Sequence, residues 1–238
     1  LITGASSGIG AATARLLAQR GLQLLLTARR VDRLQSLADE IRADGGEAEV
    51  LAADLEQPAE RERLTAEVMQ AFGCPDVLVN NAGMGWYGYY ADMPPELAHR
   101  LLELNVTAVM DLTRQFLPAM RQRRSGAIIN ISSIAGSIPS QGIAMYAGTK
   151  AFLNAFTTAL HREMRRSGVT ISVLQPGPVV TEFFDQAASQ KNGRRVPAER
   201  LAIPAERVAG AVWSLLRRPR RQAFVPWFTR LTPWISLV

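Results

Sequence analysis

Tyr146 and Lys150 are the two residues of this sequence whose types and spacing most directly suggest chemistry. They are four positions apart in a segment of helical period, so they project from the same helix face. A tyrosine acts as a general base at neutral pH only if its pKa, about 10 when unperturbed, falls substantially. A nearby ammonium supplies part of that fall by stabilising the phenolate. Taken alone, a tyrosine and a lysine at this spacing more often have no catalytic role.

A serine at the end of a predicted strand changes the interpretation of this pair. The apolar run 127–132 leads into Ser133, thirteen residues before Tyr146. Ligands of open α/β sheets bind at the carboxyl ends of the strands. A serine hydroxyl there could hold a substrate oxygen opposite the tyrosine, as a small oxyanion-type donor.

A glycine-rich loop precedes the first predicted helix, residues 9–20. Glycines let the backbone turn tightly and approach a pyrophosphate, whose charge meets the helix N-terminus. The alternative is a glycine-rich turn without function, but the position before a helix favours phosphate binding. Three residues separate the first two glycines, unlike the more familiar G-x-G-x-x-G pattern. The loop reads Thr3-Gly4-Ala5-Ser6-Ser7-Gly8-Ile9-Gly10.

The end of the second predicted strand, 22–27, should distinguish NADP(H) from NAD(H). A carboxylate there would bond the ribose 2′-hydroxyl of NAD(H), whereas arginine suits the 2′-phosphate of NADP(H). Arg29 and Arg30 follow this strand, and Asp32 is expected in the first turn of the next helix. We therefore expect NADP(H) as the preferred cofactor, with NAD(H) as the alternative. The other interpretation is that both arginines are surface residues without a role in cofactor binding.

The composition narrows the class of protein. Hydrophobic residues make up 47% and charged residues 20% of the 238 positions, which is typical of a globular chain. The single cysteine, Cys74, excludes a disulfide framework and a multi-cysteine zinc site, so no metal is expected. The net charge of +6 suits an anionic cofactor, but nucleic-acid motifs are absent and no nucleic-acid partner is expected.

Short apolar runs alternate with longer segments of helical period, which predicts βαβ units and a parallel sheet. The runs are apolar throughout, as expected where both sheet faces are covered. The predicted fold is α/β, a Rossmann-type doubly wound sheet of about seven strands with helices on both faces, in one domain of residues 1–238. Besides the strand that ends at Ile2, strands are predicted at 22–27, 48–52, 76–80, 127–132, 169–175 and 222–226, and helices at 9–20, 31–44, 58–72, 94–123, 143–167 and 204–217.

Residues 222–238 form an apolar, aromatic C-terminal strand and tail after a basic run. Its aromatic residues are Phe224, Trp227, Phe228 and Trp234. A basic run beside aromatic residues could lie on a membrane surface. A tail that folds over its own domain or a partner subunit is the favoured interpretation. No apolar run is long enough to span a bilayer and no signal peptide opens the chain, so a cytoplasmic location is expected.

The chain resembles the short-chain dehydrogenase/reductase family over nearly its whole length. The glycine loop matches the family's Thr-Gly-x-x-x-Gly-x-Gly, and Tyr146 with Lys150 matches its Tyr-x-x-x-Lys. Two features depart from the usual pattern: valine occupies both positions after Pro178, and Ser7 stands where some NADP relatives carry a basic residue. Three more motifs occur in the family's order: Asp54-Leu55, Asn80-Asn81-Ala82-Gly83 and Pro176-Gly177-Pro178-Val179-Val180-Thr181.

The resemblance implies hydride transfer between NADP(H) and an alcohol/carbonyl substrate. Tyr146 would be the acid/base, Ser133 would steady the substrate oxygen, and Lys150 would lower the tyrosine pKa and bind the nicotinamide ribose. Asn105 would hold a water of the proton relay. The alternative is a structural role in which it bonds backbone alone. Tyr146, Lys150 and the motif residues Asp54, Leu55, Asn81, Ala82, Gly83, Pro176, Gly177, Val179 and Thr181 would join the glycine loop, Arg29 and Arg30 around the cofactor.

Two alternatives stay open beside a cytoplasmic enzyme. One is a cofactor-binding regulatory or scaffold protein without turnover, against which the intact Ser133, Tyr146 and Lys150 count. The other is a reductase held at a membrane by its basic and aromatic tail. Family members are commonly oligomers, so we expect a homo-oligomer, dimer or tetramer, with helix 143–167 at the interface.

The expected substrate is a small, hydrophobic carbonyl or alcohol compound, because the loops after the strands are largely apolar and aromatic and hold no obvious carboxylate-binding cation. Its identity and the direction of the reaction do not follow from the residues. The candidate pocket residues are Trp86, Tyr87, Tyr89, Tyr90, Ile138, Gln141, Phe183 and Phe184.

Overall fold

A seven-stranded parallel sheet organises the computed structural model, which describes residues 1–138, 140–195 and 200–231. The strand order is β3-β2-β1-β4-β5-β6-β7, and every neighbouring pair is parallel. The order reverses between β1 and β4, which makes the sheet doubly wound, as predicted. The strands are β1 (Ile2–Thr3), β2 (Leu24–Thr27), β3 (Ala48–Val50), β4 (Val77–Asn80), β5 (Gly126–Ile131), β6 (Val169–Pro176) and β7 (Gln222–Val225).

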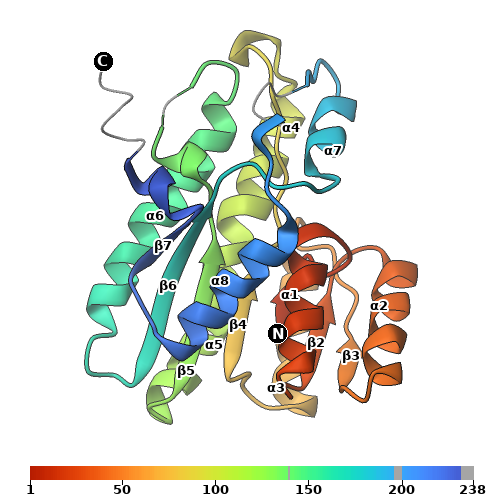
Figure 1. Cartoon of the computed structure of the whole chain (residues 1–238), viewed down its shortest axis with the longest axis vertical. Coiled ribbons are helices and arrows are strands. Elements are labelled where there is room, and N and C mark those ends of the chain that lie inside the picture. The colour runs from red at the N-terminus through yellow and green to blue at the C-terminus, as the bar shows by residue number, and fades with distance from the viewer. Residues whose placement is uncertain (139, 196–199, 232–238) are drawn as a thin grey trace.

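Helices cover both faces of this sheet, and Figure 1 shows α1 and α8 in front of it. The front layer consists of α1 (Gly8–Gln19), α2 (Val31–Ala43) and α8 (Ala205–Arg217), and the rear layer of α3 (Pro58–Ala71), α5 (Ala108–Gln122) and α6 (Ala144–Glu163). Two shorter helices, α4 (Pro95–Leu102) and α7 (Phe183–Ser189), complete the set used below. The two-sided cover confirms the expected fold class.

Neighbouring strand residues are buried on opposite faces. Leu78 packs with the rear helices, and the next residue, Val79, packs with the front helices. Ile128 and Ile129 repeat this arrangement in β5. Because side chains alternate across a sheet, a strand with helices on both sides must be apolar at every position. This explains the continuous apolar runs of the sequence.

The single helix predicted over 94–123 is interrupted. The chain stays helical, but Glu103–Thr107 forms a wider π-type turn between α4 and α5. Asn105 lies in this turn, is fully buried, and is hydrogen-bonded to the loop after β4. A π turn adds a residue to one turn of the helix without changing its apolar character, so the hydrophobic period did not reveal it.

The C-terminal strand is confirmed, the described residues after it do not cover their own domain, and cover by a partner subunit stays a prediction. β7 pairs with β6 at the edge of the sheet. Trp227 and Phe228 begin the next turn (Trp227–Leu231) with 66% and 56% of their surface exposed, so they do not fold over the domain. Trp234 lies outside the described residues. In the described part of the chain, no helix has the length and apolarity needed to cross a membrane.

Candidate active site

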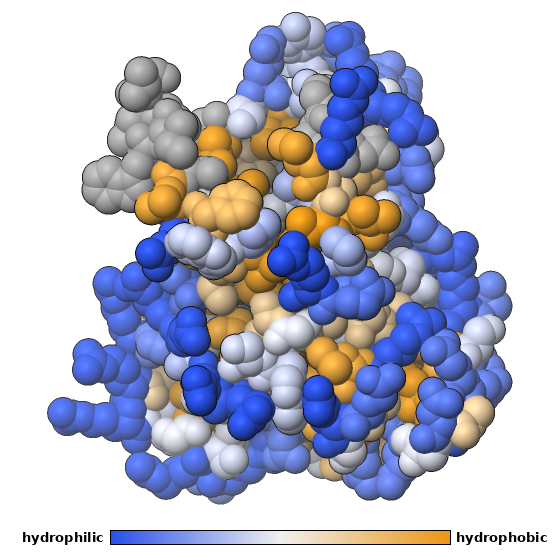
Figure 2. Space-filling model, viewed as in Figure 1, coloured by the Kyte–Doolittle hydropathy of each residue, from blue (hydrophilic) through white to orange (hydrophobic). Residues whose placement is uncertain are grey.

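A cavity of about 520 Å³ opens at the carboxyl ends of the strands. Figure 2 shows apolar side chains gathered in a hollow across this face of the molecule, with hydrophilic residues around it. Of the predicted site residues, Gly10 and Asn105 do not line the cavity. Those that do are Gly4, Ser6, Ser7, Gly8, Ile9, Arg29, Arg30, Asp54, Leu55, Asn81, Ala82, Gly83, Ser133, Tyr146, Lys150, Pro176, Gly177, Val179 and Thr181.

The glycine loop has the geometry of an anion site. Gly4 and Gly8 have φ values of 64° and 54°, which glycine adopts at little cost. Among the described residues, no side chain caps α1 at Ser7 and no acidic residue lies in its first turn. The positive end of the helix dipole and its first N–H groups therefore face the cavity without a competing carboxylate. These features fit the pyrophosphate of a dinucleotide.

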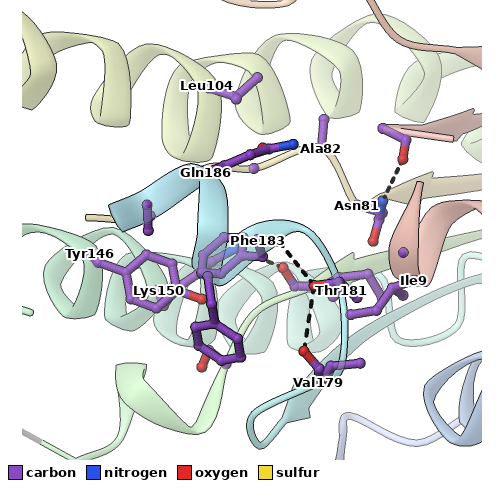
Figure 3. A pocket seen from close by; sticks show the side chains of 18 of the residues that line it. Ile9, Asn81, Ala82, Leu104, Tyr146, Lys150, Val179, Thr181, Phe183 and Gln186 are labelled. Carbon is purple, nitrogen blue, oxygen red and sulfur yellow. Dashed lines mark hydrogen bonds between the residues drawn. The ribbon is translucent and has the colours of Figure 1, made fainter. Parts of the chain in front are cut away.

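Asn81 joins the glycine loop to the end of β4. Its amide donates to the carbonyl oxygens of Thr3 at 2.9 Å and Gly4 at 3.2 Å, and Figure 3 shows the side chain directed toward the loop. The Thr3 hydroxyl in turn accepts the backbone N–H groups of Asn81 and Ala82, both at 2.9 Å. The two cofactor motifs therefore form one rigid unit, and Asn81 holds the shape of the loop.

Ser133 and Lys150 are fixed by contacts between the loop after β5 and α6. The Lys150 Nζ donates to the carbonyl of Ile131 at 3.0 Å, and the Ser132 hydroxyl donates to the carbonyl of Lys150 at 3.0 Å. Gly136 permits this close approach, because a Cβ there would lie 2.5 Å from the Lys150 carbonyl carbon. The predicted serine and lysine are thus brought to one end of the cavity.

The protein's own groups keep Tyr146 protonated. Burial raises the pKa of Tyr146 to about 12, against the opposing effect of a hydrogen bond with the Ser133 hydroxyl. Burial also lowers the pKa of Lys150 to about 8. The Lys150 ammonium lies 5.8 Å from the centre of the tyrosine ring. Burial and the Ser133 hydrogen bond account for the raised pKa of Tyr146, and its lowering by Lys150 when cofactor is bound stays a prediction.

Asn105 lies behind the cavity wall. Its carbonyl oxygen accepts the Met84 N–H at 2.9 Å, and its amide donates to the Met84 carbonyl at 2.9 Å and the Thr149 hydroxyl at 3.1 Å. A Cβ on Gly83 would lie 3.1 Å from the same Asn105 oxygen and 3.5 Å from the Lys150 Nζ. Asn105 therefore bonds both backbone and the Thr149 side chain, and its part in a proton relay stays a prediction.

Both predicted cofactor arginines have carboxylate partners. Arg29 donates to Glu56 at 2.8 Å, and Arg30 donates to Glu182 at 2.7 Å and to the Ser7 hydroxyl at 2.8 Å. Asp32 lies in the first turn of α2, as predicted. Glu56 and Glu182 were not identified from the sequence, because acids 27 and 152 positions from their arginines leave no local pattern.

The predicted substrate walls divide into two groups. Trp86, Ile138, Phe183 and Phe184 line the cavity. Tyr87, Tyr89, Tyr90 and Gln141 do not, and the Gln141 amide instead donates to the Tyr89 hydroxyl at 3.1 Å. Gln186 and Gln190 also line the cavity and were missed, because the short helix α7 was not predicted.

Fold and site together define an oxidoreductase that binds a nicotinamide dinucleotide at the carboxyl edge of a doubly wound sheet. A family model described as short chain dehydrogenase matches residues 1–192. The chain belongs to the short chain dehydrogenase family and is an NAD(P)-dependent oxidoreductase acting on CH–OH and C=O groups.

Individual relatives support this assignment at moderate identity. A short chain dehydrogenase of Pseudocercospora fijiensis (strain CIRAD86) is 39% identical to this chain. The match covers 77% of this chain and 60% of that relative. The 3-oxoacyl-(acyl-carrier-protein) reductase FabG of Escherichia coli (strain K12) is 34% identical over 89% of this chain and 86% of its own. A solved short-chain dehydrogenase from Sphingobium yanoikuyae in complex with NADPH has a TM-score of 0.88 at 32% identity, covering 99% of this chain and 90% of that one.

Proposed function

We propose that this protein transfers a hydride between NADP(H) and a hydrophobic carbonyl/alcohol pair, with Tyr146 as the proton donor and acceptor. The observation that carries the proposal is the meeting of Ser133, Tyr146 and Lys150 at one end of the cavity whose other end is the glycine loop. The dinucleotide would supply the hydride. The reacting oxygen would be held by the hydroxyls of Ser133 and Tyr146.

In the reducing direction, Tyr146 would act as the proton donor. A pKa of about 12 keeps Tyr146 protonated at neutral pH, so it is ready to donate a proton to a developing alkoxide. Lys150, with a pKa of about 8, remains largely charged and adds positive potential beside the tyrosine. Oxidation of an alcohol would need additional positive charge near the phenol to form the phenolate.

NADP(H) is the proposed cofactor because Arg30, Ser6 and Ser7 form a cationic and hydrogen-bonding group on the cavity rim. Arg30 donates to both hydroxyls, at 3.2 Å to Ser6 and 2.8 Å to Ser7. Guanidinium and hydroxyl donors suit a phosphate monoester better than a ribose hydroxyl. The remaining cofactor contacts would come from the motif residues that line the cavity.

A hydrophobic substrate is proposed from the aromatic side chains near the tyrosine. Phe183 lies beside Tyr146, with ring centres 5.5 Å apart, as Figure 3 shows. Phe184 and Ile138 add apolar surface to the same cavity. Such walls favour apolar ketones over charged acids, since a carboxylate would lose its hydration there without a paired cation.

A panel of ketones assayed with NADPH and NADH, for the wild type beside Tyr146→Phe, tests this proposal. We expect turnover of apolar ketones with NADPH and loss of turnover in the variant. Undiminished turnover in the variant would exclude Tyr146 as the acid/base. A protein that binds cofactor but turns over no carbonyl compound would favour the regulatory or scaffold alternative.

We also propose a homo-oligomer that uses the exposed face of α6. Ala151, Ala155 and Ala159 are exposed there, and small residues allow close helix contact. Phe152 and Met110 add exposed apolar surface on α6 and α5. Light scattering of the wild type and of Ala155→Arg measures this: the variant should dissociate, and an unchanged mass would place the interface elsewhere.

Peripheral membrane contact is a second candidate role, favoured by the exposure of Trp227 and Phe228. The basic residues Arg217, Arg218, Arg220 and Arg221 precede them and are also exposed. Flotation with anionic vesicles, for the wild type and the double variant Trp227→Ala/Phe228→Ala, tests this role. Failure of the wild type to float would refute membrane contact by Trp227 and Phe228.

A further inference from the structure

Three consecutive residues, Thr181 to Phe183, connect the two ends of the cavity. Thr181 packs on the glycine loop, where a Cβ on Gly8 would lie 2.7 Å from its methyl group. Phe183 packs beside Tyr146, and a Cβ on Gly85 would lie 2.4 Å from its ring. Figure 3 shows Thr181 and Phe183 on the same segment that leads into α7. A movement of this segment would therefore change the contacts with the glycine loop and with the tyrosine.

Glu182, between these two contacts, binds Arg30, which lines the cavity, and Arg33, which does not. One carboxylate oxygen accepts from Arg30 at 2.7 Å, and the other accepts from Arg33. These two guanidinium partners hold the pKa of Glu182 at about 2. The Gln186 amide also donates to Glu182, at 3.3 Å, and Arg30 itself donates to Ser6 and Ser7.

The Glu182 contacts are of a kind that an anionic ligand can replace. The Glu182 side chain is 39% exposed, and its partners Arg30 and Arg33 are 34% and 45% exposed. Ion pairs at such exposure contribute little net stability. A phosphate monoester carries up to two negative charges and three acceptor oxygens, so it offers these arginines stronger contacts than one carboxylate does.

Glu56 provides the contrast within the same molecule. Its side chain is only 8% exposed, and it accepts from both Arg29 and Arg100, at 2.8 Å and 2.6 Å. Removing a partner from a buried carboxylate leaves an uncompensated charge, which is costly. An incoming phosphate is therefore expected to exchange with Glu182 and to leave the Glu56 pairs in place.

We propose that Glu182 is a specificity-determining residue: its carboxylate occupies Arg30 and Arg33 and is displaced by the 2′-phosphate of NADP(H), which releases the Thr181–Phe183 segment beside Tyr146. NAD(H), which carries a hydroxyl in place of this phosphate, leaves the Glu182 contacts intact. Glu182 therefore acts through the arginines and through Phe183. The inference rests on the proposed NADP(H) preference.

Binding titrations of NADPH and NADH, followed by nicotinamide fluorescence, measure this competition without turnover. In Glu182→Gln the dissociation constant of NADPH should fall about fivefold, since a competing exposed ion pair is removed, while that of NADH stays within about twofold. The matched control is Asp185→Asn, one helical turn along on α7, which removes the same charge from an ion pair with Arg195. An equal gain for both cofactors, or the same gain in Asp185→Asn, would overturn the competition.

Backbone hydrogen exchange over residues 181–189 tests the release of the segment. Saturating NADPH should change exchange there relative to saturating NADH, and Glu182→Gln without cofactor should exchange faster than the wild type. Identical exchange with the two cofactors, in the wild type, contradicts the coupling.

Arg30→Ala separates failure of this inference from failure of the cofactor proposal. If Arg30→Ala leaves NADPH affinity unchanged, the NADP(H) preference itself is wrong. If Arg30→Ala weakens NADPH while Glu182→Gln changes neither cofactor, the preference stands and the Glu182 competition is refuted.

Discussion

The two ends of the cavity use polar groups in opposite ways. At the recognition end, Arg30 and Glu182 are about one-third exposed and pair with each other. At the reaction end, Ser133 and Lys150 are buried and held by backbone contacts. Exposed ion pairs exchange partners at little cost, whereas a buried polar group that loses its partner pays for its desolvation. The recognition end is thus suited to exchange, and the reaction end to fixed geometry.

The largest effect is expected at the reaction end, from Tyr146→Phe. The change keeps the ring and its contact with Phe183 but removes the hydroxyl, so turnover should fall by about a hundredfold to ten-thousandfold. Steady-state assays give the rate, and a fluorescence titration should show unchanged NADPH affinity. A variant that loses affinity and keeps its rate constant would move Tyr146 from the reaction to cofactor binding.

Gly136→Ala tests whether the reaction end is rigid. The added Cβ would lie 2.5 Å from the backbone of Lys150, so the unfolding free energy should fall by about 1–3 kcal/mol. Urea unfolding measures this change. The control is Gly148→Ala on α6, where a Cβ meets nothing within 4 Å and about 0.5–1 kcal/mol should be gained. Equal stability of the two variants would show that the loop after β5 adjusts freely.

Lys150→Met should remove a pH dependence of stability. The pKa of Lys150 is about 8 in the folded protein and 10.5 in the reference state. Between these pH values the unfolded chain keeps a proton that the folded chain has lost, so unfolding free energy rises with pH. From about pH 7.5 to about pH 9.5, the wild type should gain about 2 kcal/mol relative to the variant in urea titrations.

The contribution of Cys74, whose pKa burial raises, is the same in both proteins and cancels in this comparison. Parallel pH profiles of the wild type and Lys150→Met would mean that the buried ammonium is solvated as well as in the unfolded chain.

The smallest effect is expected at the recognition end, from Arg30→Ala. NADPH binding should weaken about tenfold with little change for NADH, and the difference should shrink as salt is added, because the contact is exposed. Titrations at two ionic strengths measure the dissociation constants of both cofactors. Arg63→Ala is the control, since Arg63 pairs with Glu60 and Glu67 on α3. A similar loss of NADPH affinity in Arg63→Ala would show that the effect comes from the protein's net charge and not from the Arg30 contact.

Local patterns predicted most of the fold. The apolar runs and helical segments indicated the strands and both helix layers, because their periods follow from each residue's own neighbours. The same patterns missed the π turn at Glu103–Thr107 and the seven-residue helix α7, where no period distinguishes the element. They also expected the tail to cover its own domain or a partner subunit, and the exposure of Trp227 and Phe228 contradicts the first of these.

The motifs, and through them the family and most of the predicted cofactor residues that line the cavity, follow from the residues alone. The contacts that constrain these residues depend on the folded chain. Glu182 meets Arg30 across 152 positions, and burial of Tyr146 sets its pKa well above the value that the spacing to Lys150 suggests. The physical reason is that motif spacing is local, whereas ion pairing and desolvation depend on every segment that folding brings to the site.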